Sequence, residues 1–161
     1  MISTILIDDH PLFNDGLCLI LKESGKFRVV EQVYDSRQAY FKCFSSRPQL
    51  VIVDYNMPHL NGLEVVKQIR SSDNRCKIVV ISMYFDKKDV SLFEEVGVDG
   101  YITKTTPSDV LIPALEKVMA GEQVFFSHNF AKTSTPSDGF AQIQQLTKRE
   151  REILKLIKAG Y

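Results

Sequence analysis

Five residues with charged or hydroxyl side chains stand directly after short apolar runs of the sequence. Asp8 and Asp9 follow the first run, and Asp54, Ser82 and Lys104 follow later ones. If these runs are neighbouring parallel strands, all five residues lie at the one edge of the sheet where such sheets bind ligands. Three carboxylates that meet there repel one another, so a hard divalent cation is their expected partner. With few carboxylates and water in the remaining positions, Mg²⁺ suits this site better than Ca²⁺.

The same residues predict chemistry on a phosphoryl group. A carboxylate held beside Mg²⁺ can act as a nucleophile towards phosphorus. The metal and a lysine neutralise the charge that spreads over the phosphoryl oxygens. The hydroxyl of Ser82 can bond to one of these oxygens, and it could therefore move when the phosphoryl group arrives.

The elements that must position these residues alternate along residues 1–121. Five runs rich in β-branched residues predict strands at Thr4–Ile7, Phe27–Val33, Leu50–Val53, Lys77–Ile81 and Tyr101–Thr103. Runs such as Ile78–Ile81 do not alternate with polar residues, which is typical of parallel strands buried on both faces. The segments between the runs repeat apolar residues at helical intervals. This order predicts an α/β, flavodoxin-like (CheY-like) doubly wound sheet of five parallel strands in the order 2-1-3-4-5.

Some residues also predict where helices begin and end and which face they bury. Asp86 has the position of an N-cap, Gly97 that of a helix stop, and Pro107 suits a first turn. In the first helix, one shared apolar face is expected, made of Leu12, Leu17, Ile20 and Leu21.

Composition excludes several classes of protein. The 161 residues are 44% hydrophobic and 25% charged, which is typical of a globular protein rather than a disordered one. The longest apolar run, Leu17–Leu21, is far shorter than the ~18 residues of a membrane span, and the N-terminus does not resemble a secretory signal. The cysteines are odd in number and widely spaced (Cys18, Cys43 and Cys76), which favours reduced thiols. We therefore expect a cytoplasmic protein with no membrane partner.

The sequence changes character after Gly121. Residues 122–145 are polar and rich in helix breakers, and they predict a linker, although Phe125, Phe126 and Phe130 could pack on the sheet domain or on a second chain. Thr147–Glu150 is a capping-box pattern that predicts a new helix. Residues 1–145 contain 15 basic and 18 acidic residues (net −3), whereas residues 146–161 contain 5 and 2 (net +3).

Four motifs occur together in residues 1–121: Asp8-Asp9-His10-Pro11, Asp54-Tyr-Asn-Met57-Pro58-His-Leu-Asn-Gly62, Ser82, and Gly100-Tyr101-Ile-Thr-Lys104. Their combination resembles the receiver domain of two-component response regulators. The resemblance implies that Asp54 accepts a phosphoryl group from a sensor histidine kinase. It implies that Mg²⁺ is bound by Asp8, Asp9, Asp54 and the backbone carbonyl of Asn56. It also implies that Lys104 pairs with the phosphoryl group and that Ser82 and Tyr101 move together as the switch.

A second resemblance concerns the segment 146–160, which is similar to the opening of a LuxR/NarL-type helix-turn-helix DNA-binding domain. This implies three parts: a receiver domain (1–121), a linker (122–145) and the first helix of a truncated DNA-binding domain (146–161). The intact protein is then expected to form a homodimer and to regulate transcription at promoter DNA. Because the recognition helix would follow Tyr161, this truncated chain is not expected to bind DNA.

Two departures from the receiver pattern concern local geometry. Thr105 stands where many receivers have a proline, usually with a cis bond, so the loop after Lys104 is expected to differ. Met83 is bulky where many receivers have a small residue, and it is a candidate to narrow the site. His10, His59 and His128 are expected at surface or capping positions rather than as ligands.

Three functions from different classes remain open at this stage. The first is a signalling switch in which Asp54 is phosphorylated and loses its phosphoryl group again, with no other enzymatic activity. The second is a Mg²⁺-dependent phosphatase that acts on external substrates, which the lack of a cap segment disfavours. The third is a phosphorylation-independent receiver that acts as a protein-interaction module.

Overall fold

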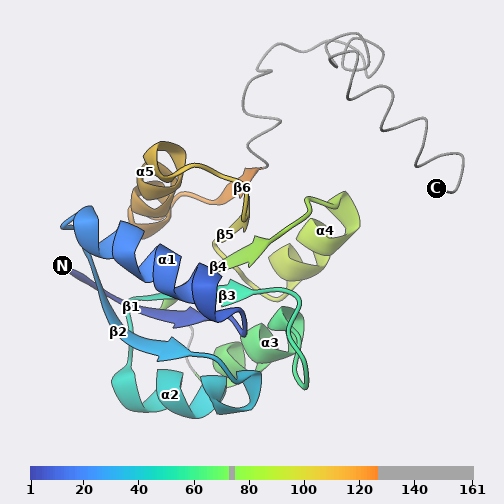
Figure 1. The fold of residues 1–161 in the computed structure, drawn as a ribbon. Helices are drawn as coiled ribbons and strands as arrows, with labels where there is room; N and C mark the ends of the chain where they lie inside the picture. The colour runs from blue at the N-terminus through green and yellow to red at the C-terminus, as the bar shows by residue number, and fades with distance from the viewer. Residues whose placement is uncertain (73–74, 127–161) are drawn as a thin grey trace, which may run out of the picture. The chain divides into compact units, whose positions relative to one another are not determined.

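In the computed structural model, which describes residues 1–72 and 75–126, a parallel sheet lies between two layers of helices (Figure 1). Its elements, in chain order, are β1 (Ile2–Ile7), α1 (Pro11–Glu23), β2 (Phe27–Val33), a short 3₁₀ helix η1 (Ser36–Gln38), α2 (Ala39–Ser46), β3 (Leu50–Asp54), α3 (Gly62–Ser72), β4 (Lys77–Ser82), α4 (Lys87–Glu95), β5 (Gly100–Thr103), α5 (Ser108–Met119) and β6 (Val124–Phe126).

The strands are all parallel and follow the order β2-β1-β3-β4-β5-β6. The predicted α/β fold and the order of the first five strands are confirmed. The sheet has one strand more than expected, because Val124–Phe126 pairs with β5 inside the segment predicted to be a linker. This apolar run is only three residues long, so its strand character depends on the open edge of β5 rather than on a pattern of its own.

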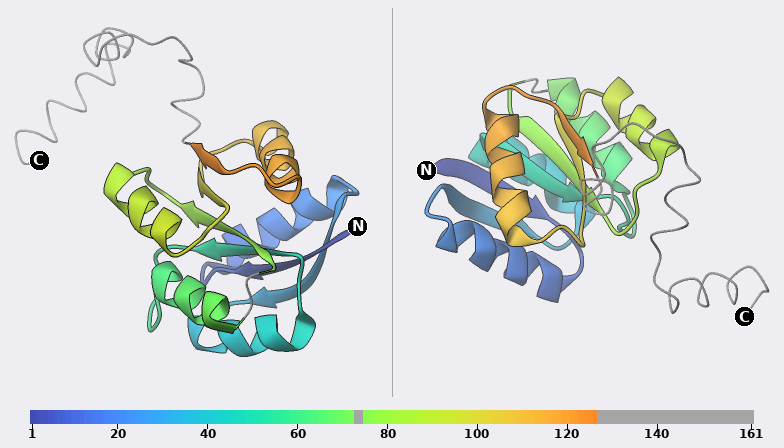
Figure 2. Two further views of the ribbon diagram at one scale, coloured as in Figure 1. Left: turned by 180° about the vertical axis from the view of Figure 1, so that it is seen from behind. Right: turned by 90° about the horizontal axis from the view of Figure 1, so that it is seen from above.

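Helices α1 and α5 cover one face of the sheet, and α2, α3 and α4 cover the other (Figure 2). Successive strand residues face opposite layers: Leu6 packs with α1 and α5, whereas Ile5 and Ile7 pack with the other three helices. Strand β6 continues this alternation, since Phe125 packs in the layer of α2–α4 and Phe126 in that of α1 and α5. Both phenylalanines therefore pack on the sheet domain itself.

Two of the expected helix boundaries are confirmed. The Asp86 side chain accepts a hydrogen bond of 2.7 Å from the backbone N–H of Lys88 at the start of α4. Gly97 follows the end of α4 with a φ of +83°, a conformation that favours glycine. Pro107 was expected in the first turn of α5. It is instead the N-cap residue, one position before the helix begins.

The prediction for the buried face of α1 is confirmed for Leu17 and Leu21 and wrong for Leu12, whereas Ile20 is only partly buried. Leu12 is 89% exposed, and the buried residues are Asn14, Leu17 and Leu21. A helix turns by about 100° per residue, so Leu12 lies about 200° from Asn14 and points away from the sheet. None of the helices in the described part of the chain is long and apolar enough to cross a membrane.

The start of α3 lies directly against the end of β3. A Cβ atom on Gly62 would stand 2.5 Å from the carbonyl oxygen of Asp54 and 2.8 Å from the Cα of Tyr55. The Gly62 N–H donates a hydrogen bond of 2.7 Å to the carbonyl of Tyr55. The loop after Asp54 therefore closes on itself only if residue 62 has no side chain.

Gly62→Ala is expected to lower the free energy of unfolding by about 1–3 kcal/mol, because its methyl group must displace backbone atoms. Gly16→Ala is the matched control, since nothing lies within 4 Å of a Cβ at that position of α1. It is expected to raise the free energy of unfolding by about 0.5–1 kcal/mol through helix propensity alone. Urea unfolding followed by circular dichroism measures both variants, and effects of the same sign would contradict this account.

Candidate functional site

The predicted site residues lie at the carboxyl edge of the sheet. Asp8 and Asp9 follow β1, Asp54 and Ser82 are the last residues of β3 and β4, and Lys104 follows β5. Since all these strands run in the same direction and are neighbours in the sheet, their ends share this edge. The order of the strands therefore places acidic, hydroxyl and basic side chains from distant parts of the sequence next to one another.

Lys104 connects two of the three carboxylates. Its Nζ lies 2.7 Å from Oδ2 of Asp8 and 3.1 Å from Oδ2 of Asp54. All three side chains are buried, with exposed fractions of 6%, 5% and 2% for Lys104, Asp8 and Asp54. On its other side, the ammonium group lies 4.5 Å from the centre of the Phe13 ring. Burial reduces the screening of these charges by water, so their interactions are stronger than those of surface ion pairs.

Burial raises the pKa of the Asp54 carboxyl above its ordinary value, and the neighbouring charge of Asp8 raises it further. Lys104 and a hydrogen bond from the backbone N–H of Asn56 act in the opposite direction and lower this pKa, but they only partly compensate. The site thus holds more negative charge than one lysine neutralises.

The acidic site has the composition and the unsatisfied atoms that a divalent cation requires. Oδ1 of Asp9 and Oδ2 of Asp54 are buried oxygens that accept no hydrogen bond of good geometry among the described residues, and Oδ2 of Asp54 has the Lys104 ammonium as an ion-pair partner at 3.1 Å. One ligand atom from each of Asp8, Asp9, His10 and Asp54 lies within 4.8 Å of the others. Clustered carboxylate oxygens are the ligands that hard cations such as Mg²⁺ prefer. Three expected metal ligands therefore lie together, whereas the role of the Asn56 carbonyl stays a prediction.

His10 lies closer to this cluster than its sequence position suggested. As expected, it is the N-cap residue of α1 and is largely exposed, but its ring also reaches the carboxylates. Its Nδ1 lies 2.9 Å from Oδ1 of Asp8, and its backbone N–H donates a 2.8 Å hydrogen bond to the same oxygen.

Ser82 and Tyr101, the two expected switch residues, bind the same peptide segment. Oγ of Ser82 accepts a hydrogen bond of 3.4 Å from the N–H of Tyr84, and the Tyr101 hydroxyl donates one of 3.1 Å to the carbonyl of Tyr84. The Tyr101 ring is fully buried between Phe85 and Phe93, with ring centres 5.8 Å and 5.6 Å away. A displacement of the Tyr84 backbone would therefore affect both residues.

One supporting residue was missed by the sequence analysis. Asn14 is fully buried, and its Nδ2 donates hydrogen bonds to the carbonyls of Asp8 (3.1 Å) and Val33 (3.4 Å). It fixes the backbone at the point where the chain leaves β1. The spacing of Asn14, Leu17 and Leu21 was the available signal, because it places a polar residue on the buried stripe of α1.

The loop after Lys104 carries Thr105 where many receivers have a proline. None of the described peptide bonds is cis. The hydroxyl of Thr103 lies 3.2 Å from those of both Thr105 and Thr106, and the N–H of Thr106 donates a 3.0 Å hydrogen bond to the carbonyl of Thr103. Met83 is 52% exposed, and its effect on the width of the site stays a prediction.

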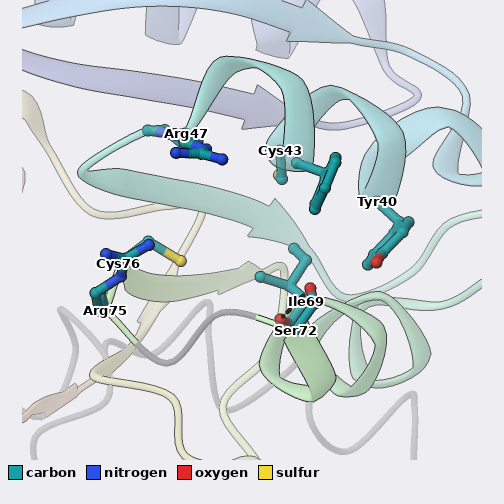
Figure 3. Close-up of a pocket in the computed structure, with 9 residues that line it drawn as sticks. Tyr40, Cys43, Arg47, Ile69, Ser72, Arg75 and Cys76 are labelled. Atoms are coloured by element: carbon teal, nitrogen blue, oxygen red, sulfur yellow. Dashed lines mark hydrogen bonds between the residues drawn. The ribbon is translucent and has the colours of Figure 1, made fainter.

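A pocket elsewhere in the fold contains none of the predicted site residues. It has a volume of about 140 Å³ and lies on the layer of α2 and α3 (Figure 3). Tyr40, Cys43, Ile69 and Cys76 are among the residues that line it. This pocket is therefore separate from the residues that carry the expected chemistry at the carboxyl edge of the sheet.

The chain is similar to known proteins over most of its length. Residues 4–116 match the response regulator receiver domain family. The chain is 33% identical to the nitrate/nitrite response regulator protein NarL of Escherichia coli, over 98% of this chain and 76% of NarL. It is 30% identical to the response regulator protein VraR of Staphylococcus aureus, over 99% of this chain and 77% of VraR.

Solved structures agree with this assignment. A LuxR-family two-component response regulator from Aurantimonas sp. SI85-9A1 superposes with a TM-score of 0.76 at 26% identity, over 82% of this chain and 94% of the other. The segment 146–161, predicted to begin a helix-turn-helix, lies outside the described residues. On its sequence match, its fold and the arrangement of its acidic site, the chain belongs to the response regulator receiver domain family.

Proposed function

We propose that this chain is a cytoplasmic signalling switch in which Asp54 accepts a phosphoryl group from a sensor histidine kinase, in the presence of Mg²⁺. One observation carries the proposal: the Asp54 carboxylate is buried at a strand end, 3.1 Å from the Lys104 ammonium and within a cluster of two further carboxylates. The family of the chain and its similarity to NarL and VraR support the same function.

In the transfer, a carboxylate oxygen of Asp54 forms a bond to phosphorus while the bond from phosphorus to the donor breaks. Lys104 is positioned to pair with the phosphoryl oxygens, which would compete with Asp8 for its ammonium group. Asp8, Asp9 and Asp54 would hold Mg²⁺, which when bound neutralises negative charge on the phosphoryl group. The chain acts on itself: water later attacks the phosphorus, the bond to Asp54 breaks, and inorganic phosphate and the free carboxylate are formed, so no external phosphate ester is turned over.

The surface beside Lys104 is suited to contact with the phosphate donor. A groove of about 320 Å³ next to the site is lined by Leu12, Phe13, Lys104, Thr106 and Leu111, among others. Leu12 is 89% exposed although it is a large apolar residue. A partner that brings a phosphorylated histidine to Asp54 would cover this surface, which explains an exposed leucine at that position.

Phosphorylation is proposed to change the face made by α4, β5 and α5. In this step the Ser82 hydroxyl donates a hydrogen bond to a phosphoryl oxygen, and the Tyr84 segment and Tyr101 move with it. Met83 and Tyr84, which follow Ser82 in the chain, expose 52% and 76% of their surface, and Leu92 of α4 exposes 45%. In the intact protein the change would drive homodimerisation and binding to promoter DNA, as expected of a LuxR-type regulator.

A small acyl phosphate is expected to add one phosphoryl group to the wild-type chain when Mg²⁺ is present, as measured by intact mass. Asp54→Asn should gain none, because its amide is not a nucleophile towards phosphorus. Asp109→Asn, an exposed acidic residue of α5, is the control and should be labelled like the wild type. Labelling of Asp54→Asn would contradict the assignment, and an unlabelled wild type would favour a receiver that signals without phosphate.

Asp54→Asn is also expected to stabilise the chain in EDTA. Because burial raises the pKa of Asp54, its charge is more costly in the folded state than in the unfolded state. Near neutral pH the variant should gain about 1 kcal/mol in free energy of unfolding, the typical cost of one poorly satisfied buried group. The gain should shrink as the pH falls through the raised pKa, because the wild-type carboxyl then becomes neutral as well. Urea unfolding at several pH values measures this, and a gain that grows towards acidic pH would refute it.

The switch can be followed through the amide resonance of Tyr84. Beryllium trifluoride, a phosphoryl mimic, is expected to shift this resonance in the presence of Mg²⁺, because Ser82 leaves the Tyr84 N–H to bind the mimic. In Ser82→Ala the free protein should already show a displaced resonance, and the mimic should move it little. Ser91→Ala, which removes an exposed hydroxyl of α4, is the matched control. An equal shift in wild type and Ser82→Ala would exclude Ser82 from the switch.

A further inference from the structure

The imidazole of His10 stands where a ligand of the same cation would stand. Its Nδ1 lies 2.9 Å from Oδ1 of Asp8, 3.3 Å from Oδ1 of Asp9 and 3.6 Å from Oδ2 of Asp54. Ligands bound at about 2.1 Å from one metal are about 3.0 Å apart in an octahedral site and about 3.4 Å apart in a tetrahedral one. The nitrogen and the carboxylate oxygens thus already have the spacing of a common coordination shell.

A second, independent observation points to a missing ligand at this place. Oδ2 of Asp54 belongs to a side chain that is only 2% exposed, and it has no hydrogen-bond partner among the described residues. Oδ1 of Asp9 also lacks a hydrogen-bond partner among these residues, although the Asp9 side chain as a whole is 24% exposed. Lys104 lies near Asp54 but is shared with Asp8, so the three carboxylates retain binding capacity that a divalent cation would use.

Helix capping does not account for the position of the His10 ring. His10 is the N-cap residue of α1, yet its side chain makes no capping hydrogen bond. Instead, its backbone N–H is bound to Oδ1 of Asp8 at 2.8 Å, which holds the base of the side chain against the cluster. The ring itself is 61% exposed, so an ion can approach from solvent on the side of His10.

We propose that His10 makes the acidic site a mixed nitrogen and oxygen site, which binds divalent first-row transition ions such as Co²⁺ and Zn²⁺ more tightly than Mg²⁺. Nδ1 of His10 is the added ligand beside Asp8, Asp9 and Asp54. Imidazole suits these ions, whereas Mg²⁺ prefers an all-oxygen shell. The inference rests on the acidic site of the proposed function, and it adds a regulation: a transition ion competes with Mg²⁺ for the carboxylates that surround Asp54.

Cobalt titration of the complete chain tests the proposal, with visible absorption and competition by Mg²⁺ as readouts. Wild type is expected to bind Co²⁺ more tightly than Mg²⁺, and Mg²⁺ in excess should displace the cobalt. His10→Ala should lose about tenfold or more in Co²⁺ affinity, since even an outer partner of a metal ligand typically contributes this much. Its affinity for Mg²⁺ should be unchanged. Zn²⁺ should also shift the ¹⁵N resonance of His10 Nδ1 in the wild type.

Two further variants make the result specific. His59→Asn removes a histidine from the loop between β3 and α3, where the residue has a φ of +69° that asparagine tolerates, and it should bind both ions like the wild type. His10→Ser removes the imidazole with a residue that favours N-cap positions, so it should reproduce the loss seen in His10→Ala without harm to α1.

The outcomes separate this inference from the proposed function. Co²⁺ affinity that does not depend on His10, or cobalt that Mg²⁺ cannot displace from the wild type, would overturn the inference, while Mg²⁺ binding and phosphoryl labelling at Asp54 would still stand. Labelling that fails while Co²⁺ binds through His10 would overturn the proposed function and leave the metal site in place.

Discussion

The rest of the site depends on one constraint, which is that three carboxylates meet beside one lysine where water screens their charges poorly. The single positive charge of Lys104 is shared between Asp8 and Asp54. It cannot neutralise the charges of these two carboxylates and that of Asp9. The raised pKa of Asp54 is the physical consequence of this imbalance and of burial. A cation that binds to this site stabilises it, because the cation reduces the excess of negative charge. Cation binding and phosphoryl transfer both require this excess of negative charge.

Repulsion between the carboxylates is opposed by the packing and hydrogen bonding of the backbone around them. The side chain of Asn14 donates a hydrogen bond to the carbonyl of Asp8, and Gly62 packs against the carbonyl of Asp54. Beyond the site, the residue next to Asp54 reaches α4 directly: the Tyr55 hydroxyl donates a 3.1 Å hydrogen bond to Asp89, and its ring lies 5.0 Å from that of Phe93. Phe93 in turn contacts Tyr101. Tyr55, the residue after Asp54, is thus connected to Tyr101 through packed aromatic rings, while Ser82 and Tyr101 both bind the backbone of Tyr84.

The parts of this structure that the sequence predicted are those that depend on local patterns. Unbroken apolar runs identified the first five strands, and the polar residues after them identified the edge at which they meet. Strand β6 could not be predicted in this way, because three apolar residues become a strand only when β5 offers them a partner. The contacts of Asn14 and His10 were missed for a related reason. Each depends on the direction in which a side chain leaves α1 or its N-cap, and the direction becomes clear only once the helix is placed on the sheet.

The geometry of the site is set by the backbone, and its charges select what binds. The N–H of Lys104 donates a 2.7 Å hydrogen bond to the carbonyl of Ser82, which fixes the end of β5 to the end of β4. The hydroxyl contacts of Thr103 with Thr105 and Thr106 hold the following turn without a cis bond. None of these contacts involves a carboxylate, so the frame persists whether the acids are protonated, paired with lysine or bound to a metal. A side chain at the rim of this frame, such as that of His10, can therefore change which ion the site prefers without a change in fold.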